Sequence, residues 1–138
     1  ASLGTNVDLD DPQQKRVDNF DLFMRLMDEP QYQGLLFGDI SAILQFNRLA
    51  HPLLTLLNRK ELHGRLFNGS DYPLPAINII LRTKDLVKHG LINEQERKWL
   101  NEIYNFNPLL FDFVAKRMVR VPTTGERFPP QVFTRALP

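Results

Sequence analysis

The 138-residue sequence contains no cysteine, which excludes disulfide bonds, thiol catalysis and thiolate metal sites. It also lacks an excess of either charge, because 17 basic and 16 acidic residues leave a formal net charge of +1. Without a basic block or stripe, nucleic acid is not an expected partner. No apolar run approaches the roughly 18 residues that a membrane helix needs, and no signal-peptide pattern is found. We therefore expect a cytoplasmic protein with no membrane partner.

The hydrophobic content of 43% is that of a folded protein with a core, and the length corresponds to one domain or part of one. Apolar residues recur at three- and four-residue steps from about Gln13, which predicts a helix that ends before Pro30. A second helical pattern covers residues 44–62, and Pro52 is expected to split or kink it.

The second half of the sequence is also helical in pattern, beginning after Pro75 and interrupted at Gly90. Residues 93–96, NEQE, fit a capping box at the start of the next helix. Asn107 followed by Pro108 fits the start of a last helix.

Two short apolar runs, residues 35–37 and 66–67, are each followed by glycine and aspartate and then by a helical pattern. This βαβα order is typical of a parallel sheet. Ligands bind at the carboxyl ends of parallel strands, which gives Asp39 and Asp71 a functional interpretation. The alternative is structural, since an aspartate before a helix is also a good N-cap.

The segment RLFNGSDYPLP at residues 65–75 resembles the eighth strand of the amidohydrolase-related family of TIM-barrel metal-dependent hydrolases. In that family an apolar strand leads into Gly-Ser/Thr-Asp, an aromatic residue and a proline. GLLFGDISAI is similar to the preceding strand, and IYNFNPLLFDF to the closing helices. The resemblance implies an α/β fold, the helix-rich C-terminal portion of a (β/α)8 barrel with about two parallel strands. Residues 1–121 would form this portion, and residues 122–138 an irregular Pro-rich tail.

The resemblance also implies a site. Asp71 would be the catalytic residue, both a metal ligand and the acceptor of a proton from metal-bound water. Asp39 and Ser70 would orient the substrate or the metal ligands. The implied cofactor of the full-length enzyme is a divalent metal, with zinc expected, and the implied partner is a small-molecule substrate.

The sequence departs from the family pattern in its histidines. The His-x-His of the first strand is absent, and His51, His63 and His89 occur within or at the ends of helical segments, where a structural role accounts for them. Because such barrels need about 250 residues, we expect this chain to be part of a larger enzyme and inactive alone. It should bind no metal by itself, and should self-associate or require a missing N-terminal part. The alternative is a non-catalytic, mainly helical interaction module in which both aspartates are caps.

Overall fold

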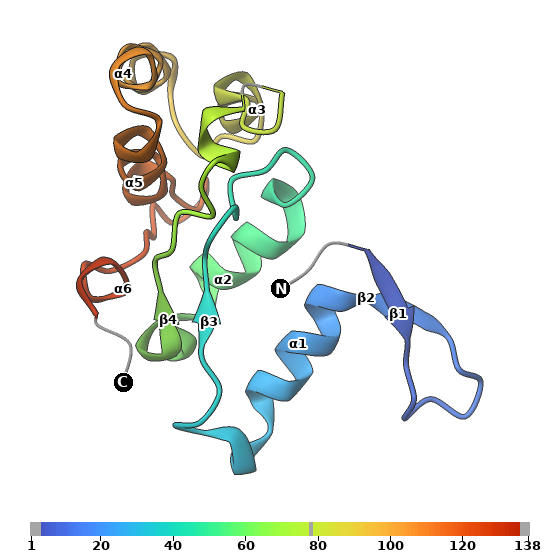
Figure 1. The fold of residues 1–138 in the computed structure, drawn as a ribbon. Helices are drawn as coiled ribbons and strands as arrows, with labels where there is room; N and C mark the ends of the chain where they lie inside the picture. Colours follow the sequence, from blue (N-terminus) through green and yellow to red (C-terminus); the bar gives the residue numbers. More distant parts are fainter. Residues whose placement is uncertain (1–3, 78, 136–138) are drawn as a thin grey trace. The chain divides into compact units, whose positions relative to one another are not determined.

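The computed structural model describes residues 4–77 and 79–135. The chain divides into two compact units, with the boundary between Asp39 and Ile40. Each unit is described by itself below, and Figure 1 labels the elements of both.

The first unit begins with an antiparallel hairpin of two short strands, β1 (Thr5–Val7) and β2 (Arg16–Asp18). The register places Thr5 opposite Asp18, Asn6 opposite Val17, and Val7 opposite Arg16. Helix α1 (Asn19–Asp28) follows directly. The predicted end of this helix before Pro30 is confirmed, but its predicted start near Gln13 is wrong, because residues 16–18 pair with β1 instead of continuing the helix.

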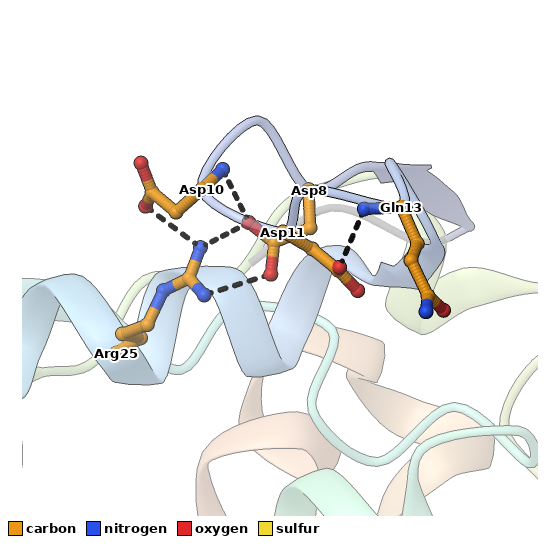
Figure 2. A network of polar contacts seen from close by, with 5 residues as sticks. All are labelled: Asp8, Asp10, Asp11, Gln13 and Arg25. Atoms are coloured by element: carbon orange, nitrogen blue, oxygen red, sulfur yellow. Dashed lines mark hydrogen bonds and ion pairs between the residues drawn. The ribbon is translucent and has the colours of Figure 1, made fainter.

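A network of polar contacts holds the hairpin loop to α1 (Figure 2). Arg25 on α1 binds Asp8 through two N–O contacts of 2.8 Å and lies 3.3 Å from a carboxylate oxygen of Asp10. Within the loop, the amide of Asp10 donates to Asp8 and the amide of Gln13 donates to Asp11. The carboxylates of this loop therefore serve to fix its conformation.

The run at residues 35–37 is not the strand that the sequence predicts. The 3-10 turn η1 (Pro30–Tyr32) precedes it, and the carbonyl of Tyr32 accepts hydrogen bonds from the amides of both Leu35 and Leu36. These bonds close a turn and leave Leu35 77% exposed. The strand of this region, β3, is limited to Gly38–Asp39.

The second unit is mainly helical and carries one further short strand. Its elements are η2 (Leu49–Leu53), α2 (Leu54–Asn58), η3 (Lys60–Arg65), β4 (Leu66–Phe67), η4 (Leu74–Ala76), α3 (Thr83–Lys88), α4 (Glu94–Phe106), α5 (Pro108–Met118) and α6 (Gln131–Thr134). Helix α4 packs beside both α5 and α3 (Figure 1). The most buried apolar side chains of this unit are Ile40, Leu44, Leu49, Leu53, Leu57, Leu66, Leu91, Leu100, Phe111, Ala115, Val119 and Val132.

Proline and asparagine set several helix boundaries as the sequence predicts. Pro52 lies in the π-helical turn η2, so the helical pattern over residues 44–62 is split into short pieces. Asn93 and Glu96 form the predicted capping box, with N–O distances of 2.8 and 2.7 Å. The Asn107 side chain accepts from two amides at the start of α5, both at 3.0 Å.

Two other predictions differ from the structure. The helix expected after Pro75 begins only at Thr83, because the preceding residues form the 3-10 turn η4 and further turns; Asn78 in this stretch lies outside the described residues. The Pro-rich tail, expected to be irregular, contains α6 and buries Val132.

The described residues form no barrel, but a fragment of a barrel would not close on itself. The (β/α)8 assignment therefore stays a prediction. Among the described residues, no helix has both the length and the apolar character needed to cross a membrane.

Candidate functional site

Asp71 lies in the loop that leaves β4, at the centre of the segment that carries the family resemblance. Its backbone has φ of +54°, in the left-handed region that aspartate tolerates better than most residues. Its carbonyl oxygen accepts a hydrogen bond from the amide of Leu74 at 3.0 Å, and its side chain is exposed. The loop thus presents the carboxylate away from the core.

A buried ion pair on α5 anchors this loop. The Nζ of Lys116 donates to the carbonyl oxygen of Gly69 and to Oδ2 of Asp112, both at 2.7 Å. The side chains of Lys116 and Asp112 are 0% and 2% exposed. A buried charge that loses its partners is costly, so Lys116 should keep its bond to Gly69. This bond holds the loop backbone to α5 two residues before Asp71.

The described local contacts around Asp71 do not include a side-chain cap to the following turn, η4. Ser70 Oγ accepts from the amide of Tyr72 at 3.4 Å, a local turn contact. The peptide bond between Tyr72 and Pro73 is cis. Pro73 is the N-cap of η4, and within the described part of the chain no side chain hydrogen bonds to the start of that turn. Among the described residues, the Asp71 side chain therefore makes no cap to η4.

A half-buried cation lies in the electrostatic neighbourhood of Asp71. Burial lowers the pKa of the Arg48 guanidinium, while the negative charge of Asp71 acts in the opposite direction. Arg48 Nη1 also lies 3.5 Å from the carbonyl oxygen of Ser41. Arg48 and Asp71 give this end of the second unit both a basic and an acidic group.

Asn68, the first residue after β4, adds an unsatisfied acceptor to the same loop. Its Oδ1 is buried and has no hydrogen-bond partner within residues 4–77 and 79–135. Buried polar atoms normally have partners, and a bound water molecule or the opposite orientation of the amide would supply one here.

Asp39, the other predicted strand-end carboxylate, is exposed at the end of β3 in the first unit. Asp71 belongs to the second unit. The placement of the two carboxylates on one rim of a parallel sheet therefore stays a prediction, whereas Ser70 and Asp71 do occur together in one loop.

The three histidines occupy positions that are typical of structural residues. His63 is buried, its Nε2 lies 2.8 Å from the carbonyl oxygen of Leu56, and its ring meets that of Phe128 edge-on. His51 Nδ1 is 3.4 Å from the hydroxyl of Thr55, and His89 is the C-cap of α3.

A complete metal centre does not arise from the described residues alone. Among them, no three His, Cys, Asp or Glu side chains come together in a geometry that could hold an ion. A catalytic zinc site uses about three protein ligands, and this loop offers one, Asp71. Any such centre needs ligands from elsewhere.

The sequence reasoning missed the Lys116–Asp112 pair, although a signal for it exists. The two residues are four positions apart on a helix, the spacing of an intrahelical ion pair, and they flank Ala115 on a face that also carries Phe111. Two opposite charges on an otherwise apolar face indicate a buried pair.

No family model matches the chain, and the comparisons with curated proteins and with solved structures found no match.

Proposed function

We propose that this chain is the C-terminal part of a metal-dependent hydrolase of the amidohydrolase-related kind, and that Asp71 supplies a carboxylate to its centre. The proposal is carried by the presentation of Asp71: an exposed carboxylate on left-handed backbone, after a strand, in a loop tied to a buried lysine. The segment around it is also the one that resembles the family motif.

In this proposal the residues in and beyond the loop have separate roles. Asp71 acts as one metal ligand and accepts a proton at its carboxylate. Ser70 and Asp39 orient the substrate or neighbouring ligands. Arg48 balances negative charge at Asp71, and Lys116 holds the loop backbone in place.

The remaining ligands lie outside the described residues, and the cofactor, a divalent metal with zinc expected, binds the full-length enzyme and not this chain alone. The substrate is a small molecule, and the compartment proposed is the cytoplasm. A His-x-His motif roughly 200 residues before Asp71 in the full-length sequence would support this arrangement, since a barrel needs about 250 residues.

The decisive variant is Asp71→Asn in the full-length protein. Asparagine tolerates left-handed backbone as aspartate does, so the loop should keep its conformation while the charge and basicity are lost. We expect turnover to fall by at least about 100-fold, the lower range for loss of a general base. Glu102→Gln, which neutralises an exposed carboxylate on α4, is the matched control. Full activity in the Asp71→Asn enzyme would refute the proposed role.

A zinc titration of the isolated chain by calorimetry tests whether Asp71 is the one metal ligand that this chain supplies. A single carboxylate cannot compensate for the water that a divalent ion must lose, so binding should be weak and unchanged by Glu102→Gln. Tight binding of one zinc per chain would mean that the ligand set has been misidentified.

A second candidate function is a non-catalytic interaction module, and exposed apolar side chains favour it. Helices α4 and α5 leave Trp99, Phe106, Leu109 and Leu110 about half or more exposed. Such residues on neighbouring elements are typical of a protein–protein contact. A full-length protein without turnover and without the upstream histidines would favour this function.

A further inference from the structure

A cleft of about 490 Å³ lies between α3 and α4, with Phe111 of α5 also in its wall. The volume is within the range of small-molecule pockets, about 300–1,000 Å³. Residues Arg97, Asn101 and Tyr104 line it from α4, spaced three or four positions apart so that they share one helix face. The start of α3 forms the opposite wall.

The cleft has an excess of one positive charge. Arg82, Lys84 and Arg97 line it. Two carboxylates stand against these three cations: Asp85, 4.0 Å from Arg82 Nε, and Glu94, 2.7 Å from Arg97 Nε. Such a lining favours a ligand with negative charge.

The two arginines keep donors available for a ligand. Arg82 uses Nε to bind the carbonyl oxygen of Ile79 at 3.0 Å, and its guanidinium lies 4.7 Å from the ring centre of Phe46. Arg97 uses Nε to bind Glu94 at 2.7 Å. Because both internal hydrogen bonds are made by Nε, each terminal pair of amino groups can donate to an oxyanion.

A bond across the cleft adds another donor. The Thr83 hydroxyl donates to Oδ1 of Asn101 at 2.8 Å, which joins α3 to α4. With its oxygen engaged in this way, Asn101 offers its amino group, a donor, to a ligand.

The remaining wall is aromatic and fixed. The Tyr104 hydroxyl donates to the carbonyl oxygen of Ala76 at 2.7 Å, and the Tyr104 ring meets that of Phe111 edge-on at 5.2 Å. The tyrosine therefore contributes ring surface, so a ligand with an apolar or aromatic body fits the cleft better than a bare inorganic ion.

We infer that the cleft between α3 and α4 binds a small organic anion, in which a carboxylate or phosphate group meets Arg82, Arg97 and Asn101 while an aromatic body lies against Tyr104. This site is independent of the role proposed for Asp71.

Calorimetric titration with three probes tests the inference: phenyl phosphate, benzoate and the neutral benzyl alcohol. We expect saturable binding of at least one anion at millimolar concentration and none of the alcohol. Tighter binding of phenyl phosphate would identify phosphate esters as the ligand class, and tighter binding of benzoate would identify carboxylates. Equal binding of the alcohol, or no binding of either anion, would overturn the inference.

Variants locate the binding. Arg82→Gln and Arg97→Gln should each weaken anion binding about tenfold or more, the cost of losing a charge-assisted hydrogen bond. Arg135→Gln, an exposed arginine outside the cleft, should bind as the parent chain does. Lys84→Gln, at an exposed position, provides a further test if either arginine variant fails to fold. Anion affinity unchanged in the folded cleft variants would refute the site.

Discussion

Lys116 is the residue on which the conformation of the candidate loop depends most directly. Replacing it with methionine keeps the length of the side chain but removes the Nζ group that binds the buried Asp112 carboxylate and the carbonyl oxygen of Gly69. We expect the free energy of unfolding to fall by about 3–5 kcal/mol, as measured by urea denaturation. The double variant Lys116→Met with Asp112→Leu should recover part of the loss, since no charge is then buried.

The exposed Lys98 is the matched control for this substitution. Lys98→Met should change the unfolding free energy by no more than about 0.5 kcal/mol. Equal midpoints for Lys98→Met and Lys116→Met would contradict the anchoring role.

Asp8 gives the first unit a dependence on pH. Hydrogen bonds from Arg25, above all, lower the pKa of Asp8 from its usual value of 3.8 to about 2. A lowered carboxylate pKa contributes stability that is complete above the unfolded value and is lost as the pH falls through the folded one. The contribution should therefore be present above about pH 4 and disappear towards about pH 2.

Arg25→Gln should reduce this dependence, because it takes away the largest cause of the lowered pKa and leaves only the backbone hydrogen bonds from Asp10 and Asp11. Thermal melts between pH 2 and pH 5 measure it, with Lys15→Gln at an exposed loop position as the control. A variant that keeps the full acid-induced loss of the parent would show that Arg25 is not the cause.

At the scale of elements, the capping box is the feature that fixes the start of α4. Asn93→Ala removes the acceptor for the amide of Glu96 and should lower the unfolding free energy by about 1 kcal/mol. Asn93→Ser should retain most of the stability, since serine is an equally good N-cap. Gln95→Ala, two residues on and exposed, should have little effect on the denaturation midpoint.

The elements also show which parts of the fold could be predicted from the sequence. Local chemistry was sufficient where a side chain bonds its own helix end, as with Asn93 and Asn107, and where a proline interrupts a helix, as with Pro52. Apolar pattern alone was not sufficient at residues 35–37, because two amides there bond the carbonyl of Tyr32 and form a turn. A short apolar run does not reveal where its backbone hydrogen bonds go.

The candidate site could be predicted only in part, for a related reason. The loop of Asp71 was visible as Gly-Ser-Asp followed by tyrosine and proline, five consecutive residues. The anchor Lys116 and the neighbour Arg48 are separated from that loop by long stretches of chain. Contacts of this kind depend on how the helices and strands pack, and the local sequence pattern does not predict this packing.

At the scale of the whole molecule, we expect self-association. Phe106 is 90% exposed, and Leu110 nearby on α5 is 47% exposed. Apolar surface of this kind is normally covered by a partner. Sedimentation velocity should show an oligomer at micromolar concentration, and Phe106→Ser with Leu110→Ser should shift it towards monomer. A parent chain that sediments as a monomer at every concentration would contradict this expectation. Lys98→Ser on α4, the helix that ends at Phe106, is the control.

The complete burial of Lys116 has a consequence for chemical labelling. Acylating reagents attack only an uncharged amine that they can reach, and the amine of Lys116 is inside the protein, bound to Asp112 and Gly69. Exposed amines such as Lys88 and Lys98 should be acylated within the reaction time, while Lys116 remains unmodified. Lys116 would then be acylated only when the segment around Gly69 detaches from α5. Peptide mass spectrometry measures this acylation. The rate at which Lys116 is acylated would therefore report the rate at which the loop opens.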